Sequence, residues 1–74
     1  MAAFRIIGPL TLKINAENTE KIDFYVDDEY QTTDEVYPFE WKKRLSHGLH
    51  TIEIIAYDAD GDISKELVDV YVLF

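Results

Sequence analysis

The residues best suited to chemistry are three aspartates at alternate positions, Asp58, Asp60 and Asp62, directly after a strand-like segment. Ca²⁺ binds six to eight oxygen ligands, and carboxylates two residues apart can converge on it in a tight loop. An EF-hand loop needs glycine at its sixth position and glutamate at its twelfth, whereas here Gly61 is fourth and Glu66 is ninth. The sequence therefore favours a hairpin turn, in which Asp60 and Gly61 adopt positive φ angles. A weak calcium site at the three aspartates is the alternative, and we expect no other metal or cofactor.

Catalytic chemistry has less support. The neighbouring acids Asp27-Asp28 and Asp34-Glu35 offer the two carboxylates that glycoside hydrolysis requires, but adjacent acids in a turn point into water. Ser46 and Ser64 both fall in expected turns, so neither is placed as an activated nucleophile. A chain of 74 residues also leaves little room for a deep cleft. We therefore expect no catalytic residue and no enzymatic activity.

The composition excludes several classes of partner. Fifteen acidic and seven basic residues give a net charge of −8, which argues against a nucleic-acid partner because phosphate contacts need a basic surface. The basic cluster Lys42-Lys43-Arg44 is too short to reverse this balance, and we expect it to be a solvated turn. No run of about 18 apolar residues is present, so we expect no membrane insertion. The chain has no cysteine and hence no disulfide framework.

Apolar and polar residues alternate along most of the chain, which predicts strands with one buried face. Alternating segments near residues 10–16, 22–26, 50–58 and 67–73 are separated by turn residues, and Asp60-Gly61 is the strongest hairpin signal. No stretch of ten residues has a helical period. The sequence predicts an all-β chain with a single domain over residues 1–74, an antiparallel sandwich of about six or seven strands. Its expected core contains Phe24, Trp41, Ile52 and Ile54.

Four fragments occur in a characteristic order: KIDFYVDDE (21–29), YPFEW (37–41), HGLHTIEIIAYDADGDIS (47–64) and the valine-rich end of the chain. Together they resemble bacterial and archaeal Ig-like domains. The resemblance covers most of the chain from Pro9 onward and implies a non-catalytic Ig-like module. Such modules are appended to extracellular glycosidases, proteases and surface proteins, where they act as spacers, cohesion domains or protein-interaction domains. It also implies an extracellular or cell-surface location within a larger protein, from which these 74 residues are an excised piece.

The resemblance also assigns a structural part to His50. In antibody-type domains a tyrosine lies two residues before the inter-sheet cysteine, and its hydroxyl closes a corner of the sandwich. Here His50 stands two residues before Ile52, so we expect His50 to make structural hydrogen bonds. The alternatives, a metal ligand or a general base, have less support.

An exposed aromatic surface is the last expected feature. If Phe24, Ile54 and the late valines face inward, then Tyr25, Ile55, Tyr57 and Tyr71 face outward on neighbouring strands. Clustered apolar groups on one surface usually mark an interface, with a neighbouring domain or another protein. Two alternatives remain open: the tyrosines stack on polysaccharide, which would make the chain a carbohydrate-binding module, or they are only favourable cross-strand pairs. A calcium-stiffened linker domain is the third functional alternative.

Overall fold

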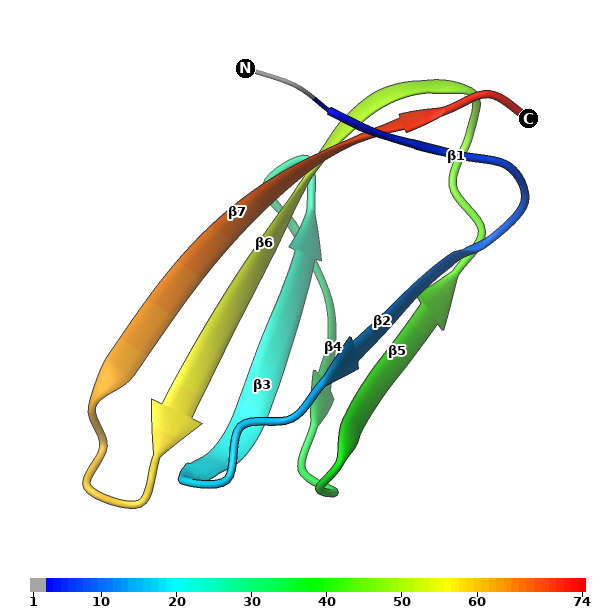
Figure 1. Cartoon of the computed structure of the whole chain (residues 1–74). Coiled ribbons are helices and arrows are strands. Elements are labelled where there is room, and N and C mark those ends of the chain that lie inside the picture. The colour runs from blue at the N-terminus through cyan, green and yellow to red at the C-terminus, as the bar shows by residue number, and fades with distance from the viewer. Residues whose placement is uncertain (1–2) are drawn as a thin grey trace.

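The computed structural model describes residues 3–74 and contains seven strands, which confirms the all-β prediction. The strands are β1 (Phe4–Ile6), β2 (Leu10–Ile14), β3 (Thr19–Val26), β4 (Glu29–Asp34), β5 (Phe39–Lys43), β6 (Gly48–Asp58) and β7 (Ile63–Val72). Five of them form one sheet in the order β1-β7-β6-β3-β4, and β2 and β5 form a second, smaller sheet (Figure 1). The described residues contain no helix long and apolar enough to cross a membrane.

All strand pairs are antiparallel except β1 with β7, which run parallel. The chain crosses from the large sheet to the small one between β1 and β2. Gly8 has a φ of 82° there, a left-handed conformation that glycine adopts without steric cost, and Pro9 follows it directly. The first strand therefore belongs to the sheet opposite the second.

The core lies between the two sheets and includes the four residues expected from the alternation. Phe24 and Ile52 are fully buried, and Trp41 and Ile54 are each 9% exposed. The rings of Phe24 and Trp41 stack with centroids 4.9 Å apart, so the small sheet is packed on the large one through an aromatic pair. Each fully buried side chain of this size contributes about 1.5–3 kcal/mol of burial free energy, which makes this cluster the main source of stability.

Two turns differ in detail from the expectation. Apart from glycines, Asp27 and Asp28 are the two residues within 3–74 with positive φ, at 48° and 68°. Positive φ at both central residues defines a type I′ turn. A two-residue type I′ hairpin turn therefore joins β3 to β4. In the β6–β7 turn Gly61 has a φ of 84°, but Asp60 does not have a positive φ, and that part of the expectation is wrong.

The basic cluster was also misplaced. Lys42 and Lys43 lie in β5 and only Arg44 follows the strand, so the segment is not a turn. Lys42 pairs with Thr11, and Lys13 pairs with Glu40, which puts these side chains on the outer surface of the small sheet. The apolar partners Leu12 and Trp41 face the core from the same two strands.

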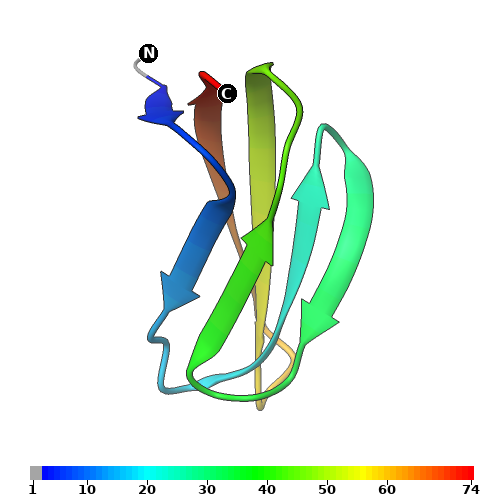
Figure 2. The ribbon, with the colours of Figure 1, turned by 90° about the vertical axis from the view of Figure 1, so that its right-hand side faces the viewer.

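The two sides of the sandwich are closed to different extents. On one side β4 contacts β5, and the Asp34 carboxylate accepts hydrogen bonds from the backbone N–H groups of Val36 and Glu40 at 2.9 and 3.0 Å. Figure 2 shows β2 at the opposite edge of the small sheet, with β7 and β6 behind. Within the described residues β2 pairs only with β5, so its other edge, on this side of the sandwich, has no strand partner.

Candidate functional site

The four side chains expected on an outer surface do lie on one face of the large sheet. In the register of β3, β6 and β7, Tyr25 pairs with Glu53, Tyr57 pairs with Lys21, and Tyr71 pairs with Leu49. These positions have the opposite parity to the core residues of the same strands. The prediction of a shared face is therefore confirmed, whereas a role for it in binding stays a prediction.

Ile55 lies between Asp23 of β3 and Lys65 of β7, and three tyrosines occupy the same half of this face. We call Tyr25, Tyr30, Ile55 and Tyr57 the tyrosine cluster. Ile55 lies outside the core cluster yet is only 7% exposed, so the expectation that it forms an accessible contact surface is wrong. It is covered because its neighbours on the sheet are large side chains. Tyr25 and Tyr30 pack edge to face with centroids 5.6 Å apart, and Tyr30 was not anticipated from the sequence.

Polar contacts hold Tyr57 in a fixed position. Its hydroxyl donates a hydrogen bond of 3.0 Å to the Asp23 carboxylate, and this bond raises the pKa of Tyr57. Asp23 also accepts a hydrogen bond from the Thr33 hydroxyl, so it links β3, β4 and β6. The Lys21 ammonium lies 4.8 Å from the centre of the Tyr57 ring and covers one of its faces. Tyr25 and Tyr57 are therefore half-buried and held by these contacts, whereas Tyr30 is 56% exposed.

Tyr71 is separate from this cluster. Its partner Leu49 is eight residues from Tyr57 along β6, which places Tyr71 roughly 25 Å away along the sheet. Tyr71 lies instead among exposed apolar side chains at the end of the molecule where β7 ends. We call this group the terminal apolar surface, and its members and exposed fractions are Ile7 65%, Leu49 61%, Tyr71 37%, Leu73 37% and Phe74 76%.

Backbone hydrogen bonds bring these segments together. The Gly8 N–H donates to the carbonyl oxygen of Phe74 at 2.6 Å, and the Leu73 N–H donates to the carbonyl oxygen of Ile6 at 2.9 Å. The His47 ring packs edge to face on Tyr71 with centroids 5.8 Å apart. In the sequence, this surface is indicated by the unbroken apolar residues at the end of the chain. Only the fold shows that Ile7, Gly8 and Leu49 lie beside them.

The aspartates after β6 close a hairpin. One carboxylate oxygen of Asp58 accepts hydrogen bonds from the backbone N–H groups of Asp60 and Asp62, both at 2.9 Å. The Asp58 backbone N–H in turn donates to the carbonyl oxygen of Asp62 at 3.0 Å. Among residues 3–74 no group of three or more acidic, histidine or cysteine side chains is arranged to hold a metal ion. The geometry therefore supports the turn, in which Asp58 acts as a backbone acceptor.

This arrangement predicts the response to calcium. Because Asp58 already binds two N–H groups, Asp58→Ala should cost about 1–2 kcal/mol of unfolding free energy, and Ca²⁺ at 0.1 mM should not raise the melting temperature of the wild type. Thermal unfolding with Ca²⁺ and with EDTA measures both. Asp60→Ala is the matched control, since its side chain accepts no hydrogen bond from the turn backbone. A Ca²⁺ stabilisation of about 2.7 kcal/mol would imply a micromolar dissociation constant and contradict the hairpin assignment.

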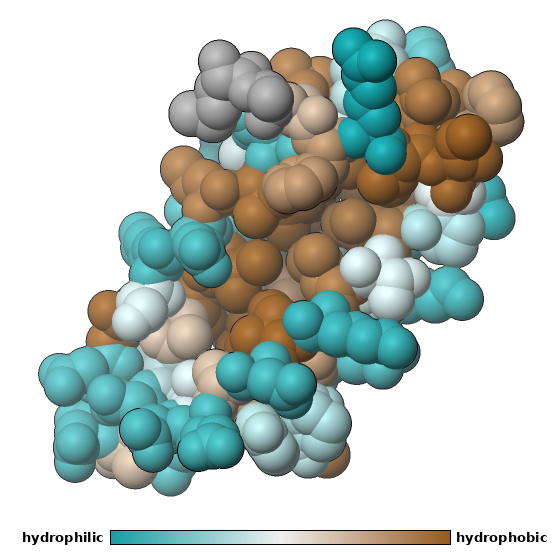
Figure 3. All heavy atoms as spheres, in the orientation of Figure 1, coloured by the Kyte–Doolittle hydropathy of each residue, from teal (hydrophilic) through white to brown (hydrophobic). Residues whose placement is uncertain are grey.

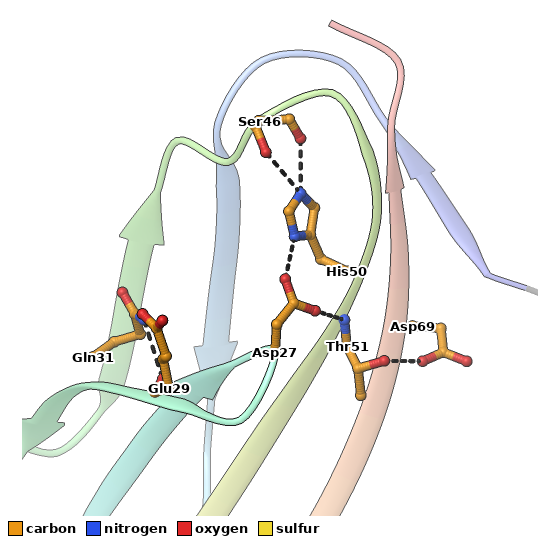
Figure 4. Close-up of polar contacts among 7 residues, drawn as sticks. All are labelled: Asp27, Glu29, Gln31, Ser46, His50, Thr51 and Asp69. Carbon is orange, nitrogen blue, oxygen red and sulfur yellow. Dashed lines mark hydrogen bonds and ion pairs between the residues drawn. The ribbon is translucent and has the colours of Figure 1, made fainter.

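His50 makes the structural hydrogen bonds expected of it, and its main partner is Asp27 (Figure 4). Its Nδ1 lies 2.6 Å from an Asp27 carboxylate oxygen, and its Nε2 lies 2.8 Å from the carbonyl oxygen of Ser46. The Ser46 hydroxyl lies further from Nε2, at 3.3 Å. An ionised carboxylate and a carbonyl only accept hydrogen bonds, so the two shorter contacts favour an imidazole that donates from both nitrogens. The bond to Asp27, followed by the bond to Ser46, raises the pKa of His50.

Asp27 reaches His50 from the β3–β4 turn. Its other carboxylate oxygen accepts a 2.9 Å hydrogen bond from the Thr51 N–H, and the Asp27 N–H donates to the Thr51 carbonyl oxygen at 2.9 Å. The bond from Thr51, and then the bond from His50, lower the pKa of Asp27. The carboxylate thus extends the pairing of β3 with β6 by one residue and ties it to the β5–β6 loop. Asp27 has a positive φ, and here the Thr51 N–H donates to its side chain.

Comparisons with known proteins support the fold. No protein-family model matches the chain, and no curated protein matches it in sequence. The fibronectin(III)-like modules of Clostridium thermocellum CbhA superpose with a TM-score of 0.78 at 28% identity, over 99% of this chain and 91% of that chain. A Jonesia denitrificans lytic polysaccharide monooxygenase superposes with a TM-score of 0.73 at 18% identity, over 96% of this chain and 58% of that chain, which shows the fold alone. The two sheets described above are those of a fibronectin III or immunoglobulin-like β-sandwich.

Proposed function

We propose that the chain is a non-catalytic accessory module of a larger exported or cell-surface protein. In this proposal its terminal apolar surface contacts a neighbouring domain of the same polypeptide or a partner protein. The similarity to fibronectin(III)-like modules over nearly the whole chain supports an accessory role and an extracellular setting. The observation that carries the proposed contact is the exposure of apolar side chains at one end of the molecule.

The terminal apolar surface fits an interface better than a solvated surface. Its five side chains come from the β1–β2 connection, from β6, from β7 and from the two residues after β7. Backbone hydrogen bonds among these segments fix their relative positions. Contiguous exposed apolar groups on a small soluble domain usually mark a contact with another protein. The net charge of −8 keeps such a domain soluble while this surface is uncovered.

Carbohydrate binding by the tyrosine cluster is the second candidate. A sugar ring stacks on a flat, accessible aromatic face, as in other aromatic recognition surfaces. Here Lys21 covers one face of the Tyr57 ring, and Tyr25 and Tyr30 lie at 72° to one another. These contacts favour a packed surface over a flat stacking platform, and we therefore rank polysaccharide below a protein partner.

Two triple variants separate these candidates. Leu49→Ser/Tyr71→Ser/Leu73→Ser should leave the isolated domain folded, since exposed positions change stability by about 0.5 kcal/mol or less each. In the intact host protein, wild-type amides at the start of β6 and the end of β7 should exchange more slowly with deuterium than in the isolated domain. The variant should remove that protection.

Tyr25→Ser/Tyr30→Ser/Tyr57→Ser is the matched control and should keep the protection at the terminal apolar surface. If only this control variant loses it, the proposed contact surface is wrong. Retention of the wild type on insoluble polysaccharide, lost in the control variant, would instead establish the carbohydrate-binding alternative.

A further inference from the structure

The side of the sandwich between β2 and β7 contains an apolar groove. Its volume is ≈ 370 Å³, and it is lined by Phe4, Ile6, Leu10, Thr11, Leu12, Val68 and Val70. Figure 3 shows apolar side chains as a continuous brown area across the middle of this side of the molecule. The next residues along β2 and β7, among them Ile14 and Glu66, line a second hollow of ≈ 410 Å³. The groove therefore follows the full length of β2.

One wall of the groove is a strand edge without a partner. β2 pairs with β5 on one side, and within residues 3–74 no strand pairs with its other side. An unpaired edge presents a row of backbone N–H and C=O groups that can pair with another strand. An added strand would also direct every second side chain inward, against Val68 and Val70. We propose that this groove binds an extended segment of a partner protein by strand addition to β2.

Charge favours a single segment of a partner over a second copy of this chain. Behind β2 the groove is lined by Phe4 and Ile6 of β1 and by Val68 and Val70 of β7. A second copy that paired its own β2 here would bring together two small sheets that are both rich in lysine, and like charges oppose such a pair. One strand with apolar inward side chains has the thickness that the groove accepts.

The basic residues of the small sheet indicate which outward-facing side chains the bound segment should have. The small sheet and its end carry four of the seven basic residues of the chain, Lys13, Lys42, Lys43 and Arg44, against one acid, Glu40. This region thus has a local charge of +3 in a chain of net charge −8. A strand beside β2 places its outward side chains next to Lys13, where opposite charges stabilise the pair and like charges oppose it. The segment that fits has apolar residues alternating with acidic ones. Glu66 and Lys65 both line the second hollow with Ile14, so their opposite charges offset one another there.

The test is a titration of the ¹⁵N-labelled chain with two blocked seven-residue peptides. In one peptide valine alternates with aspartate, and in the other valine alternates with lysine. In 0.15 M salt the valine–aspartate peptide should shift the amide signals of residues 10–14 saturably and bind more tightly than the valine–lysine peptide. This preference would run against the net charge of the whole chain, so general electrostatic attraction does not produce it.

Lys13→Glu tests the position of the peptide. It should weaken the valine–aspartate peptide by about threefold to tenfold. Lys21→Glu makes the same change of charge on the opposite sheet and should alter binding by less than about twofold. Equal effects of the two variants, saturable shifts outside β2 and β7, or no saturable shift with either peptide would overturn the proposal. If the amide signals of residues 10–14 shift with protein concentration in the absence of peptide, the groove binds a second copy of this chain and the proposal is wrong.

Discussion

Replacing Trp41 with alanine is expected to remove most of the folding stability of this chain. Trp41 lies on β5 and stacks on the fully buried Phe24 of β3, so it joins the two sheets. Truncation of a large buried aromatic residue costs about 3–5 kcal/mol, because it loses the burial free energy and leaves a cavity. A domain of this length has roughly 4–11 kcal/mol in total. We expect the variant to be partly or largely unfolded at 37 °C.

Urea denaturation followed by circular dichroism measures this loss, since the variant lacks the one tryptophan of the chain and gives no tryptophan fluorescence. Trp41→Phe keeps an aromatic ring against Phe24 and should lose less than Trp41→Ala. Phe74→Ala removes a ring that is 76% exposed and should leave the midpoint nearly unchanged. An unchanged midpoint in Trp41→Ala would mean that the two sheets are held together elsewhere.

The alternation of side chains was sufficient to predict this core. Ile22, Phe24 and Val26 alternate with charged and aromatic residues, and all three are buried as that pattern requires. Burial of one face fixes the register of a strand, because a slip of one residue would expose every apolar side chain. The same logic placed Tyr25 and Tyr57 on the outer face of the large sheet.

The position of each residue along its strand was not predictable in the same way. Tyr71 shares a face with Tyr57 but lies at the other end of it, since the pairing of Tyr71 with Leu49 is set by the length of the β6–β7 turn. The open edge of β2 was equally hidden, because β2 alternates like any half-buried strand whether it has one partner or two. Strand order across a sheet depends on contacts between distant segments, and local pattern does not encode it.

The partner of His50 was missed for a similar reason. The histidine was assigned to structural hydrogen bonding, but Asp27 was assigned only to a turn. Their contact joins residues 23 positions apart and depends on the left-handed backbone of Asp27. A side chain that is short, acidic and tolerant of positive φ suits this position, yet Asp28 has the same properties in the sequence and makes no such contact with His50.

Removal of Asp27 should also lower the free energy of unfolding. Asp27→Ala leaves the Thr51 N–H and the His50 Nδ1 without their acceptor, and charged hydrogen bonds of this kind contribute about 1.5–3 kcal/mol when buried. Asp27 is 51% exposed, so solvent screening reduces the expected loss to about 1–2 kcal/mol. Asp28→Ala, at the neighbouring turn position, is the matched control and should lose less.

The pH dependence of stability provides an independent test of this pair. The pKa of His50 is raised above 6.5, so its stabilisation is fully present below about pH 6.5 and is lost as the pH rises through the folded pKa. The pKa of Asp27 is lowered below 3.8, so its stabilisation is present above about pH 3.8 and is lost as the pH falls through the folded pKa. The pair should therefore stabilise the fold most between these limits.

Variants test the contribution of this pair directly. The difference in unfolding free energy between wild type and His50→Gln should be largest near pH 5–6 and should shrink as the pH rises towards 9. An NMR titration of the imidazole protons should give a His50 pKa above 6.5, and Asp27→Asn should lower it. A His50 pKa at or below 6.5 would contradict the doubly donating imidazole, and the Asp27 and Ser46 contacts would then need a different proton arrangement.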